Sequence, residues 1–257
     1  MSGGLKSTSF EDIVNHLKGL GICESANVIV HSKLFAFGRI DSENPVKCIY
    51  DALRSAIGET GTIACPTYVF STDYNHVFDP ASSPAETGAL SEYIRKLPGA
   101  IRTSSPIHSH AAIGPLAVHF LRSDPGTSIG PGSDFEKLRD LDFRLLLLGC
   151  KFSEGATYLH HLEAMHEVPY RKWITLKKKV KSDNHQNGME IPVRYFARAN
   201  EDHVEDFDPV GEHLREQGLL ETKNAPYGKS ASIPIQTLDK QVGKMLDANP
   251  YALVKRK

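Results

Sequence analysis

Short apolar runs alternate with amphipathic stretches along this chain, and that order constrains the fold more than any other feature of the sequence. Each apolar run is only four or five residues long and shows no exposed face, which is typical of a strand buried on both sides. Three such runs are residues 27–31 (NVIVH), 62–65 (TIAC) and 145–148 (LLLL). Strands of this kind alternating with helices predict an α/β fold around a largely parallel central sheet.

Helix boundaries are marked by capping residues. Phe10 to Leu20 carries a helical apolar stripe, with Ser9 as N-cap and Gly21 as stop. A second helix is expected from Pro45 to Ile57, started by Asn44 and ended by Gly58. Two further helices are expected at Gly88–Leu97 and Leu238–Leu246.

The C-terminal third changes character. Residues 173–180 and 191–196 flank a polar Asn187-Gly188 pair, which predicts an antiparallel hairpin packed on an edge of the sheet. Residues 201–208 hold five carboxylates in eight positions, and such a charge run is typical of a solvated loop. We expect residues 1–257 to form one domain.

Composition excludes several function classes. The chain has 30 Lys+Arg against 31 Asp+Glu, a formal charge of −1, so we expect neither nucleic acid nor an anionic membrane as partner. No apolar run reaches the ~20 residues that span a bilayer, and Met1–Lys6 lacks the apolar run of a secretory signal. Four widely spaced cysteines indicate reduced thiols. We therefore expect a cytoplasmic protein, and a homodimer stays open.

Polar segments directly follow the three expected strands. They are residues 31–35 (HSKLF), 66–68 (PTY) and 149–152 (GCKF). In a parallel sheet all three emerge on one side, where the sites of open α/β folds gather.

A helix starting near Thr157 carries two candidate catalytic residues. His160 and Glu163 are three residues apart and share one face of it. A carboxylate beside an imidazole stabilises the imidazolium that forms on proton abstraction, which suits a general base. The alternative is an ordinary contact on the helix surface.

The polar residues allow two other interpretations. His108 and His110 have the HxH spacing of metal ligands, and with His160 they define an alternative, a metal-dependent hydrolase. Residues 126–130 (GTSIG) match the nucleophile-elbow pattern, but prolines flank them where a strand and a helix are required. We therefore expect a surface loop there and no metal site.

Five blocks, in order, resemble the aminoglycoside 3-N-acetyltransferase family over nearly the whole chain. Residues 30–34 (VHSKL) are similar to its VHSSL, and residues 61–68 (GTIACPTY) to its GTLxMPTF/Y. Residues 78–92 carry the family's FDP and GALTE-like elements, and residues 106–114 (PIHSHAAIG) resemble HPTHSVAAxG. Residues 147–171 resemble LLG, TSLHLAE and VPYR in turn.

The resemblance implies an α/β sandwich distinct from the GNAT acyltransferase fold. It implies acetyl transfer from acetyl-CoA to an amine of an amino sugar or aminoglycoside, a small-molecule acceptor. His160 then matches the family's general base and Glu163 its acid. Matching blocks give the coenzyme-binding candidates His31, Ser32, Lys33, Leu34, Phe35, His108 and Ser109. They also give the acceptor-binding candidates Tyr68, Asp79 and Tyr170.

Some residues depart from the family pattern. Lys33 replaces a serine, Ser105 a histidine, and His110 an apolar residue. Since a polycationic antibiotic needs an acidic pocket, these changes keep a second acceptor open. It is a nucleotide-linked amino sugar, whose phosphates would suit Lys33, Lys151 or Arg171. A non-catalytic binding protein is the remaining alternative.

Overall fold

The central sheet of the computed structural model is built on the three apolar runs of the sequence. The structure describes residues 7–70, 76–182 and 184–257. The seven strands of the central sheet, in spatial order, are β12 (Glu221–Ala225), β13 (Gly228–Pro234), β8 (Phe143–Leu148), β2 (Asn27–Ser32), β4 (Thr62–Pro66), β7 (His110–Ile113) and β6 (Ile101–Arg102).

The strands of this sheet are parallel only at its centre. β2 runs parallel to both β4 and β8, whereas every other neighbouring pair is antiparallel. The expectation of a largely parallel sheet is therefore wrong. The four outer strands are joined in pairs by short connections, between β6 and β7 and between β12 and β13, and short connections produce antiparallel neighbours.

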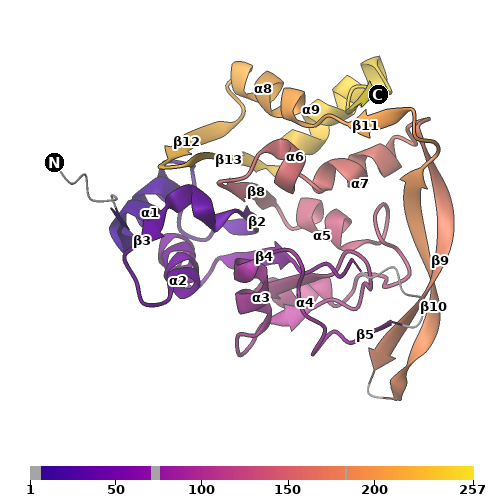
Figure 1. Ribbon diagram of the computed structural model, residues 1–257, viewed down its shortest axis with the longest axis horizontal. Coiled ribbons are helices and arrows are strands. Elements are labelled where there is room, and N and C mark those ends of the chain that lie inside the picture. The colour runs from indigo at the N-terminus through magenta and orange to yellow at the C-terminus, as the bar shows by residue number, and fades with distance from the viewer. Residues whose placement is uncertain (1–6, 71–75, 183) are drawn as a thin grey trace.

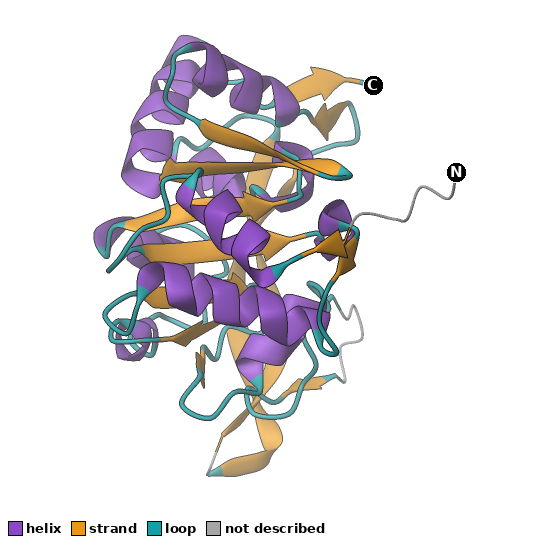
Figure 2. Cartoon of the chain, turned by 90° about the vertical axis from the view of Figure 1, so that its left-hand side faces the viewer, coloured by secondary structure: helices purple, strands orange, loops and turns teal. Residues whose placement is uncertain are grey.

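Helices cover both faces of the sheet, as Figure 2 shows. The longer helices are α1 (Phe10–Lys18), α2 (Pro45–Ile57), α3 (Ala89–Arg95), α5 (Asp134–Asp140), α7 (Tyr158–Met165), α8 (Asp208–Glu216) and α9 (Ile235–Ala248). The shorter ones are the 3-10 turn η1 (Leu34–Phe37), α4 (Ala117–Phe120) and α6 (Phe152–Gly155).

Strand β8 shows how one apolar run builds two cores. Leu145 and Leu147 pack into a core beneath α5, α7, α8 and α9, while Leu146 and Leu148 pack into a second core beneath α1, α2 and α3. All four are at most 1% exposed. Because successive side chains of a strand point to opposite faces, a strand covered on both sides must be apolar throughout.

The predicted helix boundaries are largely confirmed. The Ser9 hydroxyl accepts the Asp12 N–H and the Asp12 carboxylate accepts the Ser9 N–H, a capping box that starts α1. Helix α2 has the predicted bounds, with the Asn44 side chain accepting the Lys47 N–H. Helices α3 and α9 lie within two or three residues of their expected ends.

The long hairpin forms a sheet of its own. β9 (Arg171–Ser182) and β10 (His185–Arg198) are antiparallel as predicted, but with β5 (Val77–Phe78) they make a separate three-stranded sheet. In Figure 1 this sheet runs along the right-hand side of the molecule. The prediction that the hairpin packs on an edge of the central sheet is wrong.

Three local predictions are also corrected. Gly188 does not form the hairpin turn but lies inside β10, at positive φ, where the pairing register shifts. Residues 201–208 are not merely a solvated loop, because β11 (His203–Glu205) pairs with β14 (Val254–Arg256). Residues 126–130 form the expected loop, but Thr127–Gly130 are buried instead of on the surface.

The remaining short strands are β1 (Ser7–Thr8) and β3 (Arg39–Ile40), which pair in parallel. Among the described residues, none of the helices has the length and apolar character needed to cross a membrane. All four cysteines are free and three are buried. The expectation about Met1–Lys6 lies outside the described residues.

Candidate active site

The carboxyl ends of β2, β4 and β8 meet at one edge of the sheet, as the sequence predicts for parallel strands. The close approach of the segments that follow β8 and β2 requires glycine at position 149. Gly149 has φ +70, and a Cβ there would lie 2.8 Å from the Lys33 carbonyl oxygen and overlap the Ala36 side chain. The chain can therefore turn at the end of β8 directly against the segment that follows β2.

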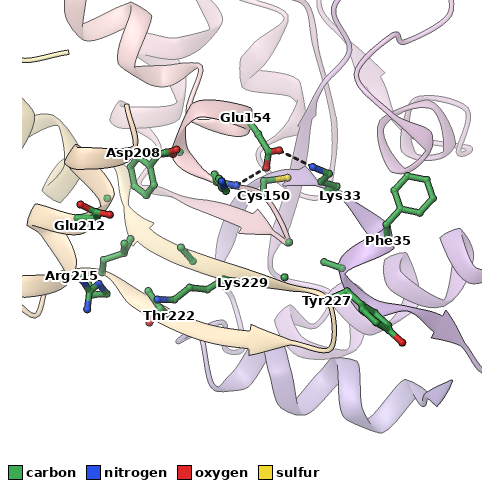
Figure 3. A pocket seen from close by; sticks show the side chains of 18 residues that line it. Lys33, Phe35, Cys150, Glu154, Asp208, Glu212, Arg215, Thr222, Tyr227 and Lys229 are labelled. Atoms are coloured by element: carbon green, nitrogen blue, oxygen red, sulfur yellow. Dashed lines mark hydrogen bonds and ion pairs between the residues drawn. The ribbon is translucent and has the colours of Figure 1, made fainter. Parts of the chain in front are cut away.

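A large cavity of about 740 Å³ lies beside this turn, and we call it the lysine cavity. Residues from the ends of β2 and β8, from α8 and from β12–β13 line it, as Figure 3 shows. Its charged lining residues are Lys33, Lys151, Glu154, Asp208, Glu212, Arg215 and Lys229. Its size falls within the range typical of ligand pockets.

Two exposed aromatic rings also line the lysine cavity. Phe35 is 84% exposed and Tyr227 is 64% exposed. The Tyr227 N–H donates to the Ala36 carbonyl at 2.8 Å, which ties the β12–β13 turn to η1. Lys33 forms an ion pair with Glu154 at 2.7 Å, and both side chains are more than one third exposed. The groups of this cavity are therefore largely solvated.

A second cavity, of about 420 Å³, contains His160, and we call it the histidine cavity. Its lining comes from the end of β4, the start of α7, the end of β10, and β11. The residues are Tyr68, Phe70, His108, Ile129, Thr157, His160, Arg171, Tyr195, Phe196, Arg198 and Glu205.

His160 is held by a buried carboxylate. Its Nδ1 lies 2.6 Å from Oε2 of Glu163, whose side chain is fully buried. Nη2 of Arg171 lies 3.1 Å from this Nδ1 and 2.8 Å from Glu205, but the ionised Glu163 carboxylate only accepts hydrogen bonds, so its 2.6 Å contact requires a proton on Nδ1. We therefore assign the Nδ1 proton to His160, donated to Glu163, which leaves Nε2 as the free acceptor of the ring.

Glu163 is itself paired from two sides. Nε of Arg171 lies 2.7 Å from Oε2, and the Tyr170 hydroxyl donates to Oε1 at 2.9 Å. Burial and the Glu163 charge raise the pKa of Tyr170, so its phenol stays protonated and donates. A buried carboxylate needs such partners, because an unpaired one costs several kcal/mol.

Glu205 is the carboxylate from the acidic run that reaches the histidine cavity. It pairs with Arg171 and also with Arg198, whose Nε donates to Oε1 at 3.1 Å and whose Nη2 contacts Oε2. Burial alone would raise the pKa of Glu205, but the hydrogen bonds and charge of Arg198 lower it below the ordinary value. Its negative charge is thus shared between two guanidinium groups.

His108 and His110 face different partners. Nδ1 of His108 lies 2.6 Å from the Ser128 hydroxyl, whereas Nδ1 of His110 lies 3.0 Å from the buried Asp134 carboxylate. The second ring nitrogen of His110 faces the Tyr68 hydroxyl at 3.4 Å. In the described ranges, no three His, Cys, Asp or Glu side chains are grouped to hold a metal ion. The structure therefore does not assemble the ligand set of the hydrolase alternative.

The coenzyme-binding candidates are divided by the structure. Lys33 and Phe35 line the lysine cavity, and His108 lines the histidine cavity. Ser109 is fully buried, with its hydroxyl donating to the Thr67 carbonyl at 2.7 Å.

The other candidates at the end of β2 line neither cavity. His31 lies beside Gly155, and burial and the His110 charge lower its pKa to about 3. Ser32 is half-buried at the end of β2, and Leu34 packs against the core beneath α1, α2 and α3.

The acceptor-binding candidates are also divided. Tyr68 lines the histidine cavity, whereas Tyr170 lies behind it with its hydroxyl on Glu163. Asp79 lies away from the lining residues, paired with Lys181 at 2.9 Å. Hydrogen bonding to Lys181 lowers the pKa of Asp79 to about 2 against the opposing effect of burial.

Several site residues were not singled out from the sequence. Arg198, Glu205, Ser128 and Tyr227 come from segments far apart along the chain, and only the fold brings them to the two cavities or to a residue that lines one. Arg171 stands in the VPYR block, and the sequence offers it as a phosphate-binding candidate. The Ser128 signal was present in the GTSIG pattern, whose loop was expected at the surface.

Comparison with known proteins identifies the family of the chain. Residues 29–247 match the family model described as aminoglycoside 3-N-acetyltransferase. Aminoglycoside N(3)-acetyltransferase IV of Salmonella sp. is 33% identical over 233 residues, covering 89% of this chain and 82% of the relative. The chain belongs to the aminoglycoside 3-N-acetyltransferase family. It is therefore a member of a family of acyltransferases.

Solved structures of this family share the fold. A variant of aminoglycoside acetyltransferase AAC(3)-IVa in complex with apramycin superposes with a TM-score of 0.80 at 25% identity, covering 97% of this chain and 96% of the other. AAC-IIIb in its binary complex with CoASH gives a TM-score of 0.82 at 20% identity, covering 95% and 97%. The mixed α/β architecture is thus that of known acetyltransferases of the family.

Proposed function

We propose that this chain transfers an acetyl group from acetyl-CoA to an amine of an aminoglycoside, with His160 as general base. The observation that carries the proposal is the buried Glu163 at 2.6 Å from His160, beside a cavity at the carboxyl ends of the central strands. Family membership supplies the reaction class, and apramycin and CoASH are ligands of its relatives. We take the fold to be distinct from GNAT.

The lysine cavity fits the coenzyme. Lys33, Arg215 and Lys229 would meet the phosphates, and the exposed faces of Phe35 and Tyr227 suit an adenine ring. Lys33 is one of the residues expected to bind the donor, and it stands where the family has serine. When bound, acetyl-CoA supplies an activated thioester carbonyl.

The histidine cavity then receives the acceptor amine. His160 keeps Nε2 free because Nδ1 is committed to Glu163, so Nε2 takes a proton from the attacking nitrogen. Glu163 compensates the imidazolium charge that results, and Arg171 and Tyr170 fix the carboxylate. The acetyl group passes directly to the amine, and the proton on His160 is available to the departing thiolate.

A second acceptor class is supported by the two arginines of the histidine cavity. Arg171 and Arg198 bracket Glu205, so this carboxylate is already paired before any ammonium arrives. A nucleotide-linked amino sugar carries phosphates that such guanidinium groups bind well. It is the second candidate acceptor.

The test is thiol release from acetyl-CoA across a panel of amines. The panel contains apramycin, gentamicin, simple amino sugars without phosphate and a nucleotide-linked amino sugar. Mass spectrometry of the product confirms acetylation. The proposal predicts turnover with at least one aminoglycoside. Turnover of the nucleotide-linked sugar alone would establish the second candidate, and no turnover with any amine would contradict acetyl transfer.

A further inference from the structure

We infer that His108 is a second catalytic residue, whose Nε2–H donates a hydrogen bond to the acetyl carbonyl oxygen as negative charge develops on it. This inference rests on the proposed function. It assigns to a side chain of the histidine cavity the stabilisation of the oxyanion, which acyl transfer requires and His160 does not provide.

The Ser128 hydroxyl decides which nitrogen of His108 carries the proton. Ser128 is 1% exposed, and in the part of the chain that the structure describes its hydroxyl has one hydrogen-bond partner, Nδ1 of His108 at 2.6 Å. If Nδ1 carried the proton, the buried serine O–H would have no acceptor, a penalty of about 1–3 kcal/mol. The serine therefore donates to Nδ1, and the proton of the ring resides on Nε2.

The ring of His108 is held in place by aromatic neighbours. Its centroid lies 4.8 Å from that of Tyr68, 5.8 Å from Phe135 and 6.2 Å from Tyr195. Nδ1 is occupied by Ser128, and His108 lines the histidine cavity together with His160. The remaining polar atom, Nε2–H, is therefore the atom available to a ligand in that cavity.

The surroundings of His108 keep its ring uncharged. Burial, followed by the charges of His160 and His110 and then that of Arg171, lowers the pKa of His108 to about 3, and a hydrogen bond with the Ser128 backbone opposes this shift. A neutral imidazole donates one hydrogen bond at Nε2 and does not compete with His160 for the proton of the amine. The two histidines of the cavity thus have different roles, because one ring is bound to a carboxylate and the other to a hydroxyl.

The amine nitrogen attacks the carbonyl carbon, a C–N bond forms, and the π electrons move to the carbonyl oxygen, which accepts the hydrogen bond from Nε2 of His108. His160 takes the proton of the nitrogen. The oxygen electrons then re-form the C=O bond, the C–S bond breaks, and the thiolate of coenzyme A leaves and takes a proton from His160.

The same geometry explains the GTSIG pattern without a serine nucleophile. The Ser128 hydroxyl is buried, does not line the histidine cavity and is committed to His108. Its role is that of a positioning residue acting through the imidazole.

The first test compares three variants in the steady state. His108→Phe keeps the ring volume and removes the donor, so kcat should fall by about 10²–10³-fold, as for loss of one oxyanion donor. His108→Gln places an amide N–H near the former Nε2 and should restore at least tenfold of that loss. Ser128→Ala should lower kcat by a smaller factor, with KM for the acceptor changed less than kcat. Thermal unfolding shows whether each variant is folded.

The second test does not depend on turnover. Long-range ¹⁵N–¹H NMR of the imidazole groups reports which nitrogen is protonated, and His108 should show a protonated Nε2 and a bare Nδ1 from pH 5 to pH 8. Ser128→Ala should mix the two tautomers. A protonated Nδ1 of His108 in the unmodified protein would overturn the inference. A folded His108→Phe variant with unchanged kcat would also overturn it, and so would a His108→Phe variant whose only change is a higher KM for the acceptor. If the wild-type protein acetylated no amine, the proposed function would fail while the tautomer result stood.

Discussion

The lysine cavity and the histidine cavity differ in how their charges are held. In the lysine cavity Lys33 and Glu154 pair with side chains 53% and 37% exposed, whereas in the histidine cavity Arg171 and Glu163 pair with side chains 6% and 0% exposed. Exposed pairs contribute little to stability and rearrange readily, while breaking a buried pair is costly. Under the proposed function, the adaptable groups of the lysine cavity bind the donor and the fixed groups beside the histidine cavity carry out the chemistry.

The largest expected effect is on His160, in the histidine cavity. His160→Ala removes the general base, and kcat should fall by about 10²–10⁴-fold while KM for acetyl-CoA stays close to its original value. His166→Ala is the matched control, because His166 follows the same helix but pairs with the exposed Asp247 at 3.1 Å. Equal turnover in the two variants would remove His160 from the mechanism.

The stability of two variants tests the difference between the buried and the exposed ion pair. Glu163→Ala leaves the buried Arg171 without one of its two carboxylate partners and should lower the free energy of unfolding by about 3–5 kcal/mol, as is usual for one half of a buried pair. Glu154→Ala breaks the exposed pair with Lys33 and should cost no more than about 1 kcal/mol. Urea unfolding of both variants gives the comparison, and similar losses would contradict it.

The lysine cavity is expected to govern donor binding. Tyr227→Ala removes an exposed ring, and KM for acetyl-CoA should rise by about 5–150-fold if the ring stacks on adenine, since such a contact is worth about 1–3 kcal/mol. The acceptor KM and kcat should hardly change. Tyr251→Ala is a control, since this tyrosine is 42% exposed and lines neither cavity. An effect confined to the acceptor KM would contradict this prediction, because it would indicate that the lysine cavity binds the acceptor.

The remaining expected effect is a pH dependence of stability from a buried histidine of α7, His161. Burial, followed by the charge of Arg139, lowers the pKa of His161 to about 3, so between about pH 3 and 6.5 the unfolded chain binds a proton that the folded chain does not. Its contribution is complete above pH 6.5 and is lost as the pH falls, by up to about 1.4 kcal/mol per pH unit.

The measurement is urea unfolding of His161→Asn between pH 4.5 and 6.5. Asparagine has no titratable group and keeps an acceptor for the Gly130 N–H, which in the native protein donates to Nδ1 of His161 at 3.1 Å. The slope of unfolding free energy against pH should therefore become shallower than in the wild type. An unchanged slope would show that His161 titrates normally in the folded protein.

Local structure could be predicted from the sequence, whereas contacts between segments far apart in the chain could not. Capping residues such as Ser9 and Asn44 act within three positions, so α1 and α2 begin where predicted. Buried runs such as 145–148 are apolar on both faces, and for that reason they can be predicted as buried strands. The partners of β9 and β10 are not encoded locally, which is why the hairpin was expected on the wrong sheet.

The same limit applies to the site. His160 and Glu163 are three residues apart on one helix, and their contact could be predicted from helical geometry alone. Glu205 reaches Arg171 from 34 positions along the chain, and Ser128 reaches His108 from 20 positions, through loops whose path no periodicity indicates. These contacts depend on tertiary structure, so they become visible only in the fold.

The proposed roles of the two cavities, donor binding in the lysine cavity and acetyl transfer in the histidine cavity, are tested most directly by a crystal structure with coenzyme A. We predict the nucleotide in the lysine cavity, between Phe35 and Tyr227, with the thiol sulfur directed toward His160. A nucleotide bound in the histidine cavity, or a sulfur atom out of reach of any amine that touches Nε2 of His160, would contradict it.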